Sequence, residues 1–143
     1  MKKITKSEKE TMELACNYAK KLKGGEIIGL IGDLGAGKTV FAKGLARGLG
    51  AKNVINSPTF VLMKIHSVRH KNIKRFIHID AYRIKSAEDI TAIGAGEYFN
   101  RPDTVTVIEW ADKIKKILPI TSIKVKIEYK TKNQRLIKFT KNL

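Results

Sequence analysis

A glycine-rich octapeptide, residues 32–39 (GDLGAGKT), constrains the fold of this chain more than any other feature. It fits the phosphate-loop pattern G-x-x-x-x-G-K-[ST] in every required position. The apolar run 26–31 before it is typical of a strand covered on both faces, and residues 40–47 after it have a helical pattern. A strand, a glycine-rich loop and a helix in this order predict a nucleoside triphosphate site rather than a simple turn into a helix.

The residue types within the loop indicate its chemistry. Gly32, Gly35 and Gly37 permit backbone conformations that a Cβ hinders, so that successive N–H groups can surround the β-phosphate of a nucleotide. Lys38 is long enough to reach the β- and γ-phosphates, and the Thr39 hydroxyl falls where it can bind Mg²⁺. We therefore expect a catalytic role for Lys38. Nucleotide contacts are expected from Leu34, Gly35, Ala36, Gly37, Lys38 and Thr39.

The length and composition limit the classes of protein to consider. A chain of 143 residues fits one compact ATPase domain, residues 1–143, and leaves no room for a separate substrate domain. No apolar stretch is long enough to cross a bilayer, and the N-terminal segment is charged rather than similar to a signal-peptide core. Cys16 is the only cysteine, so no intrachain disulfide can form. We expect a cytoplasmic protein that makes no membrane contact.

The chain is strongly basic, with 29 Lys and Arg residues against 13 Asp and Glu residues and a formal net charge of +16. Such an excess attracts nucleic acid or an acidic partner, and a solvated basic surface is the alternative. The densest basic run, residues 66–75, has few interleaved aromatic residues and so lacks the stacking platform of a single-strand reader. The histidines have no ligand-like spacing, and we assign no metal to His66, His70 or His78.

Strand and helix patterns alternate along the chain. The capping box Ser7-x-x-Glu10 predicts a first helix that ends near Gly24 and Gly25, before the phosphate-loop unit. Beyond that unit we expect strands at 60–65 and 76–79, a short helix at 87–93, a strand at 104–108, and a hairpin at 123–139 that turns at 132–133. The predicted fold class is α/β, a P-loop NTPase-type three-layer sandwich whose mixed central sheet has a parallel core and antiparallel hairpins.

Two acids end predicted strands, Asp80 after the run 76–79 and Glu109 after the run 104–108. Ligands gather at the carboxyl ends of parallel strands, and a phosphate-loop enzyme needs a carboxylate at its metal. One acid is therefore expected to hold Mg²⁺ and the other to orient the attacking water or act as base. The sequence does not decide which acid has which role. Thr59 lies in the polar loop that we expect to meet the γ-phosphate.

Several classes of phosphate-loop protein fit these features to different extents. A small-molecule kinase shares the loop, but this chain has little room for an acceptor domain or an arginine-rich lid. A GTPase needs a guanine-reading [NT]-K-x-D, and the nearest string, residues 131–134, lacks the acid, so adenine is favoured. A nucleotide-dependent binding module is the non-enzymatic possibility. We expect an ATPase and retain the binding module and the kinase as alternatives.

Four motifs together resemble the bacterial TsaE (YjeE) family. They are residues 32–39 (GDLGAGKT), 57–60 (SPTF), 78–83 (HIDAYR) and 108–110 (IEW), in that order and at those separations. The phosphate loop alone is shared with many ATPases, whereas the set of four motifs in a chain of this length is specific. The resemblance extends over nearly the whole chain.

The resemblance implies a small ATPase that binds ATP and Mg²⁺. Members of the family work with TsaB and TsaD in forming N6-threonylcarbamoyladenosine on tRNAs that read codons starting with A. In this family, TsaD itself transfers the threonylcarbamoyl group to tRNA. The TsaE protein is a weak ATPase alone, and its hydrolysis of ATP supports turnover of the TsaB–TsaD assembly. The expected partners are therefore TsaB and TsaD, with tRNA met through their complex.

The resemblance also implies site residues. It places Asp80 and Glu109 at the metal and the attacking water, with Trp110 beside them, and Thr59 in a switch-like loop. Thr39 and both acids are the implied Mg²⁺ ligands, and Lys38 holds phosphate. Two positions match residues near the nucleotide in the family: one is Glu8 or Thr11, and the other is Arg135. Arg83 either points into the site or braces the switch loop.

Overall fold

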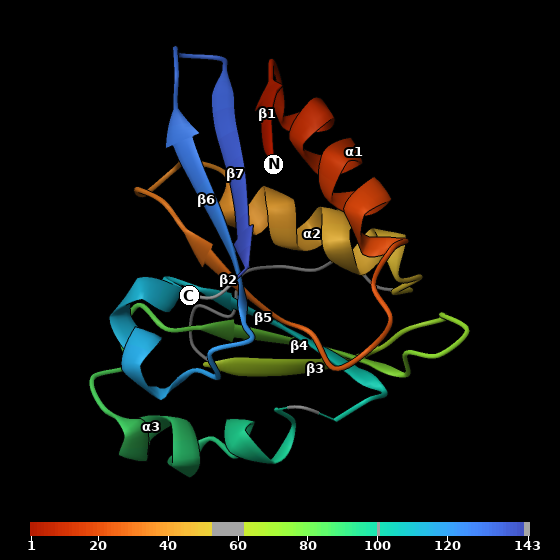
Figure 1. Cartoon of the computed structure of the whole chain (residues 1–143), viewed down its shortest axis with the longest axis vertical. Coiled ribbons are helices and arrows are strands. Elements are labelled where there is room, and N and C mark those ends of the chain that lie inside the picture. Colours follow the sequence, from red (N-terminus) through yellow and green to blue (C-terminus); the bar gives the residue numbers. More distant parts are fainter. Residues whose placement is uncertain (53–61, 100, 142–143) are drawn as a thin grey trace.

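The computed structural model describes residues 1–52, 62–99 and 101–141 (Figure 1). Its centre is a 7-stranded sheet with the strand order β1-β7-β6-β2-β5-β4-β3. The strands are β1 (Lys2–Thr5), β2 (Ile27–Ile31), β3 (Met63–Ser67), β4 (Arg75–Asp80), β5 (Thr104–Glu109), β6 (Ile123–Tyr129) and β7 (Arg135–Lys141). The helices are α1 (Glu8–Ala19), α2 (Lys38–Gly48) and α3 (Ala87–Ala92), with 3-10 helices η1 (Ala95–Glu97) and η2 (Ala111–Ile117).

The sheet is parallel at its centre and antiparallel at its edges. Strand β2 pairs in parallel with β5 and β6, and β5 pairs in parallel with β4. The hairpins β3–β4 and β6–β7 are antiparallel, as is the pair β1–β7. Every residue of β5 is buried, as expected for a strand covered on both faces. The predicted mixed sheet is therefore confirmed.

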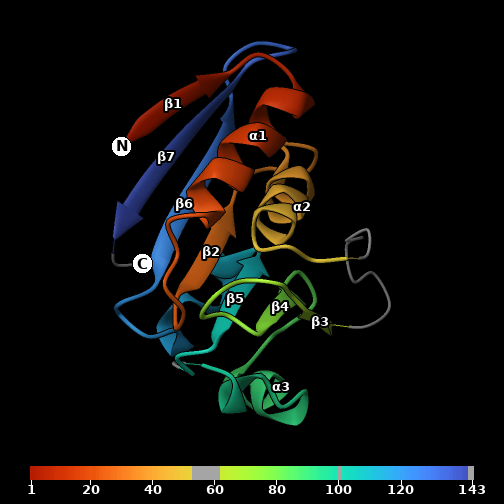
Figure 2. The same cartoon turned by 90° about the vertical axis from the view of Figure 1, so that its right-hand side faces the viewer.

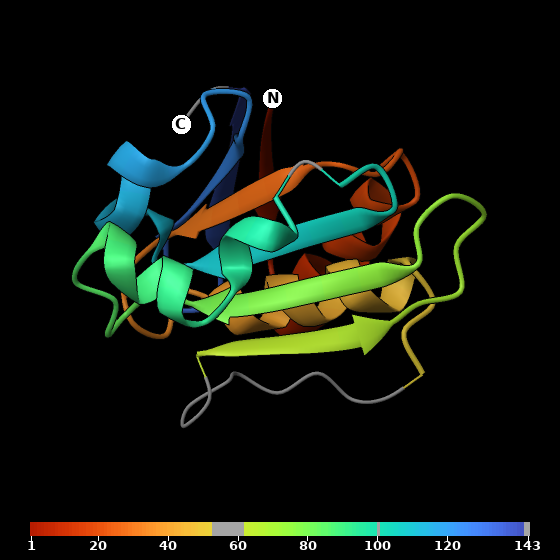
Figure 3. The same cartoon turned by 90° about the horizontal axis from the view of Figure 1, so that it is seen from below.

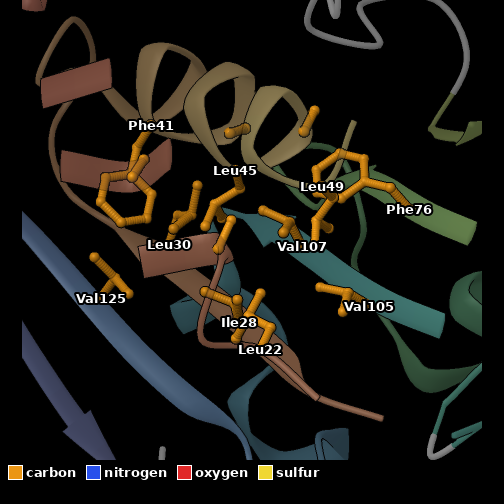
Figure 4. Close-up of a cluster of buried hydrophobic side chains, with 14 of the residues drawn as sticks. Leu22, Ile28, Leu30, Phe41, Leu45, Leu49, Phe76, Val105, Val107 and Val125 are labelled. Carbon is orange, nitrogen blue, oxygen red and sulfur yellow. The ribbon is translucent and has the colours of Figure 1, made fainter. Parts of the chain in front are cut away.

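Helices cover both faces of the sheet. Helices α1 and α2 lie side by side on one face (Figure 2), where Phe41 and Leu45 of α2 pack on Leu30 and Val107 (Figure 4). Helix α3 lies on the other face (Figure 3), and there Ile90 belongs to a second buried cluster with η1, η2 and the sheet. Two apolar clusters on either side of one sheet give the predicted three layers.

Close approach of α1 and α2 depends on Gly44. A Cβ at this position would lie 2.5 Å from the carbonyl oxygen of Met12 and 2.6 Å from the Cβ of Ala15. Real Cβ atoms do not tolerate such distances, so α1 can pack this closely only against glycine. The packing fixes the start of α1 near the phosphate-loop end of α2.

The predicted first helix begins where expected but ends earlier. Ser7 caps it, because its hydroxyl accepts a hydrogen bond of 3.1 Å from the N–H of Glu10. The prediction of an end near Gly24 and Gly25 is wrong, since the helix ends at Ala19. The carboxylate of Glu26 accepts the N–H groups of Lys23 and Gly24 at 2.8 and 2.7 Å and so holds a loop there.

Strand β1 is an addition that the sequence did not predict. Its residues pair with β7 from Lys2, opposite Lys138, to Thr5, opposite Arg135. The first three residues of β1 are exposed: two are lysines and the third is a single isoleucine. The segment therefore has no alternation of apolar and polar residues that would predict a strand. Within the described ranges, no helix is both long enough and apolar enough to cross a membrane.

Candidate phosphate-binding site

The phosphate loop connects the end of β2 to the first turn of α2. Gly37 immediately precedes α2 and has a φ of 112°, a left-handed conformation that favours glycine. Helix α2 then begins at Lys38. Its N-terminal N–H groups, which have no partner within the helix, therefore face the loop, and they favour an anion there.

The β6–β7 hairpin holds the loop from outside. The hydroxyl of Tyr129 donates to the carbonyl of Leu34 at 3.3 Å, and Nε of Arg135 donates to the carbonyl of Ala36 at 3.0 Å. Because C=O and N–H of a trans peptide point in opposite directions, the N–H groups of Gly35 and Gly37 are turned away from these two donors. The hairpin thus helps to set the orientation of the loop amides.

Arg135 is held in place by its own hairpin. Its Nη1 donates to the carbonyls of Thr131, Lys132 and Gln134 at 3.4, 3.1 and 3.2 Å. Its guanidinium lies 4.1 Å from the ring centroid of Tyr129. Arg135 therefore connects the turn of the hairpin rigidly to the phosphate loop, in addition to lining a cavity.

The ammonium group of Lys38 lies inside the loop. Nζ donates to the carbonyls of Gly32 and Asp33 at 2.6 and 2.8 Å and lies 3.9 Å from the ring centroid of Trp110. The residue is 5% exposed. Burial lowers the pKa of Lys38, and the negative charge of Glu109 opposes this change most strongly. The Lys38 ammonium therefore lies in the field of the site's carboxylates, of which Glu109 is buried and Asp80 half-buried.

Glu109 joins three elements at the carboxyl end of β5. Its Oε1 accepts a hydrogen bond of 2.9 Å from Oγ1 of Thr39, in the first turn of α2. Its Oε2 lies 2.6 Å from Nε2 of His78 on β4. Glu109 is 3% exposed. Both of its carboxylate oxygens are thus fixed by neighbouring side chains.

Asp80 lies directly beside Glu109, because these residues are partners in the β4–β5 register. Its Oδ1 accepts the N–H of Tyr82 at 2.9 Å. Asp80 is half-buried and lines a cavity with Lys38 and Thr39. The two acids therefore meet at one edge of the sheet, as the sequence predicted, but in different surroundings.

Trp110 follows Glu109 and borders the same site. Its φ of 59° is left-handed, which makes it the one non-glycine residue in the described part of the chain with a positive φ. Its ring centroid lies 5.0 Å from that of Tyr82, and Lys113 Nζ lies 4.4 Å from the Tyr82 ring centroid. Trp110 therefore packs against Tyr82, lines the same cavity as the two acids, and contacts the Lys38 ammonium.

Two cavities lie on either side of the phosphate loop. One, of about 550 Å³, is lined by side chains that include Lys38, Thr39, Asp80 and Glu109, with Arg83 at its wall. The other, of about 330 Å³, lies between the start of α1 and the β6–β7 turn. Glu8, Gly35, Gly37 and Val40 line both cavities.

The structure brings together the predicted site residues that it describes. Thr11, Ala36 and Arg135 line the smaller cavity, and Leu34 lines the larger one. The hydroxyl of Thr11 is 2.7 Å from that of Thr5, so it also ties α1 to β1. The switch-loop prediction for Thr59 lies outside the described residues.

Sequence reasoning missed the roles of two residues, His78 and Tyr129. His78 stands two positions before Asp80 in a strand, so the alternation of side chains already puts both on one face of the sheet. That signal was present in the sequence. The contact of Tyr129 with Leu34 depends on the path of a distant hairpin, and no local pattern indicates it.

Comparisons with known proteins show the family of this chain. The family model described as threonylcarbamoyl adenosine biosynthesis protein TsaE matches residues 5–137. The tRNA threonylcarbamoyladenosine biosynthesis protein TsaE of Rickettsia typhi is 40% identical over 136 residues, covering 94% of this chain and 91% of the relative. The protein of the same description from Bacillus subtilis is 37% identical over 137 residues, covering 95% of this chain and 82% of the relative.

A solved structure is also similar. The crystal structure of Bacillus subtilis YdiB has a TM-score of 0.80 and 32% sequence identity, and the match covers 100% of this chain and 86% of that chain. The sheet, its helical layers and the loop between β2 and α2 define a phosphate-loop α/β protein, as predicted. The chain belongs to the TsaE family, which confirms the resemblance of its four motifs.

Proposed function

We propose that this protein is a Mg²⁺-dependent ATPase of tRNA threonylcarbamoyladenosine biosynthesis, weak alone and activated by TsaB and TsaD. The ATPase proposal rests above all on the hydrogen bond of 2.9 Å from Thr39 to Glu109, next to the Lys38 ammonium. This contact unites a phosphate loop with a buried carboxylate at the end of a strand, the combination that phosphoryl transfer uses. The descriptions of the family and its members support the pathway.

The two cavities accommodate different parts of ATP. Cavities of about 300 Å³ or more are typical of small-molecule sites. The nucleoside occupies the cavity of about 330 Å³, beside Glu8, Thr11 and Arg135. The phosphates lie on the loop N–H groups and α2, and the γ-phosphate lies in the cavity of about 550 Å³ with Lys38.

The residues at the larger cavity fit a magnesium ion. Thr39, Asp80 and Glu109 offer a hydroxyl and two carboxylates, the oxygen ligands that Mg²⁺ prefers. The Thr39 hydroxyl donates its proton to Glu109 and keeps its lone pairs for a metal. When bound, Mg²⁺ neutralises charge on the β- and γ-phosphates.

The different surroundings of the two acids suggest different roles. Glu109 is buried and accepts a hydrogen bond from Thr39. We therefore assign Glu109 to binding Mg²⁺, either directly or through a water molecule. Asp80 is more exposed and faces the same cavity, so we assign it to orienting the attacking water or accepting its proton. Lys38 stabilises the negative charge that the phosphates carry during hydrolysis.

Activation by partners follows from the need for a further cation. Hydrolysis is accelerated by a positioned arginine, which is often supplied by another protein. Arg83 lines the larger cavity and is exposed, so contact with TsaB–TsaD either supplies such a group or orders Arg83. In this proposal the protein acts in the cytoplasm and meets tRNA through the TsaB–TsaD complex.

Phosphate release from ATP, with and without Mg²⁺, tests the ATPase proposal. Lys38→Ala is expected to abolish release, whereas Lys43→Ala, a lysine of the same helix that lines neither cavity, is expected to leave it unchanged. ATP binding without release in the presence of TsaB–TsaD would favour the non-enzymatic binding module. Transfer of the γ-phosphate to a metabolite instead of water would favour the kinase.

A further inference from the structure

We propose that His78 is a positioning residue for the magnesium site, acting through Glu109 on Thr39. This inference rests on the proposed Mg²⁺-dependent function. It assigns a role to a buried histidine of β4 that neither contacts the cavities nor belongs to the phosphate loop.

The geometry of His78 is directed at Glu109. Its side chain is 0% exposed, and its Nε2 lies 2.6 Å from Oε2 of Glu109. An ionised carboxylate has no proton to give, so Nε2 of the imidazole is the donor. A histidine that donates to a metal-side carboxylate fixes the orientation of that carboxylate.

Among the described residues, the other surroundings of His78 give it no competing polar contact. The ring centroids of His78 and Phe76 are 6.3 Å apart. In the sheet, His78 is paired with Lys64 on β3 and with Val107 on β5. In the part of the chain that the structure describes, Nδ1 is buried without a hydrogen-bond partner. The bond to Glu109 is therefore the interaction that compensates for burying this polar ring.

Two hydrogen bonds transmit the orientation to the loop. His78 donates to one oxygen of Glu109, and Thr39 donates to the other. With both oxygens engaged, the carboxylate cannot rotate without breaking a bond. The Thr39 proton is then directed at Glu109, and its lone pairs are left for the metal. Removing His78 frees the carboxylate and, with it, the direction of the Thr39 hydroxyl.

Four variants separate positioning from simple filling of the core. His78→Gln keeps an amide donor close to the place of Nε2, whereas His78→Met keeps the volume and removes the donor. His78→Asn is polar but too short to reach Glu109. His66→Met is the matched control, because His66 is a half-buried histidine on the neighbouring strand that has no bond to Glu109 and whose Nε2 has no partner among the described residues.

The test measures ADP affinity by calorimetry with Mg²⁺ and with EDTA, because ADP is not hydrolysed. Thermal unfolding establishes that each variant is folded. We expect His78→Met and His78→Asn to reduce the Mg²⁺-dependent gain in affinity by about tenfold or more. His78→Gln and His66→Met are expected to retain most of the gain. Affinity in EDTA is expected to be the same in every variant.

Three results would overturn the inference, and the first is distinguishable from the other two. If wild-type protein shows no Mg²⁺-dependent gain, the proposed metal site fails, and the role of His78 fails with it. If wild-type protein shows the gain and His78→Met or His78→Asn keeps it in full, only the role of His78 fails. An equal loss in the Gln and Asn variants would also overturn it, since position of the donor would then not matter.

Discussion

Thr39 and Glu109 are 70 residues apart in the sequence and are joined by a hydrogen bond of 2.9 Å between Oγ1 and Oε1. The bond connects the first turn of α2 to the end of β5. It brings the last residue of the phosphate loop to the acid that the sequence marked as a metal or water residue. The chemistry proposed for this protein depends on that contact.

Replacing each of the two acids, Glu109 and Asp80, by its amide is expected to have a different effect. In Glu109→Gln, a neutral amide replaces the carboxylate that contacts Thr39 and His78, so the variant lacks the negative charge and one of the oxygens that we assign to binding Mg²⁺. We expect this variant to lose the Mg²⁺-dependent gain in ADP affinity. Asp80→Asn is expected to keep that gain and to lose about 10²-fold or more in ATP hydrolysis. Calorimetry and phosphate release measure the two effects, and identical profiles for both variants would refute the division of roles.

Tyr129→Phe removes the hydroxyl that donates to the carbonyl of Leu34. One neutral hydrogen bond contributes about 0.5–1.5 kcal/mol, so we expect ATP affinity to fall roughly two- to tenfold through a looser phosphate loop. Tyr98→Phe, at a residue that lines neither phosphate-loop cavity, is the control and is expected to bind normally. Fluorescence titration with a nucleotide analogue measures both. Unchanged ATP affinity in Tyr129→Phe would show that this contact of the β6–β7 hairpin does not help to orient the amides of the phosphate loop.

Gly44→Ala is expected to lower the free energy of unfolding, although alanine favours helix. The new Cβ would meet the carbonyl of Met12 at 2.5 Å and separate α1 from α2. Overpacking of this kind costs about 1–3 kcal/mol, more than the gain of about 1 kcal/mol in helix propensity. Gly96→Ala meets no atom within 4 Å and is expected to change stability by less than roughly 0.5 kcal/mol. Urea unfolding measures both, and equal stability of the two variants would refute the close helix contact.

Asp103 is expected to make stability depend on acid pH. A hydrogen bond from the Thr104 hydroxyl, and then the charge of Arg75, lower the pKa of Asp103 below 3.8. Its contribution is present above the unfolded-state pKa and is lost as the pH falls through the lower folded-state pKa. Wild-type protein is therefore expected to be more stable than Asp103→Asn at pH 6. The difference between their free energies of unfolding is expected to be smaller at about pH 3. Urea unfolding at both pH values measures this difference, and a difference that is the same at pH 6 and pH 3 would contradict the prediction.

The fold was largely predictable where local patterns are strong. The run before Gly32 and the helix after Thr39 were recognised from their patterns, and the strand that ends at Asp80 was recognised from its apolar run. Strand β1 was missed, because its pairing with β7 is a contact between the two ends of the chain. The early end of α1 was missed because Glu26, after the glycines, forms the loop there.

The site was predictable where a residue type carries its own chemistry. Lys38, Asp80 and Glu109 were found from a motif and from the ends of strands. The support from His78 and Tyr129 was not found, because it depends on which strands are neighbours and how a hairpin crosses the loop. Sequence periodicity gives the face on which a side chain lies, whereas its partner comes from the topology of the sheet.

The most direct test of the central claim measures phosphate release from ATP by wild-type protein alone and with TsaB–TsaD, while threonylcarbamoyladenosine on tRNA is counted in the same reaction. We predict slow release alone, an increase of roughly tenfold or more with the partners, and more than one modified tRNA per TsaD molecule. Release that is unaffected by TsaB–TsaD, together with tRNA modification that does not depend on this protein, would contradict the account.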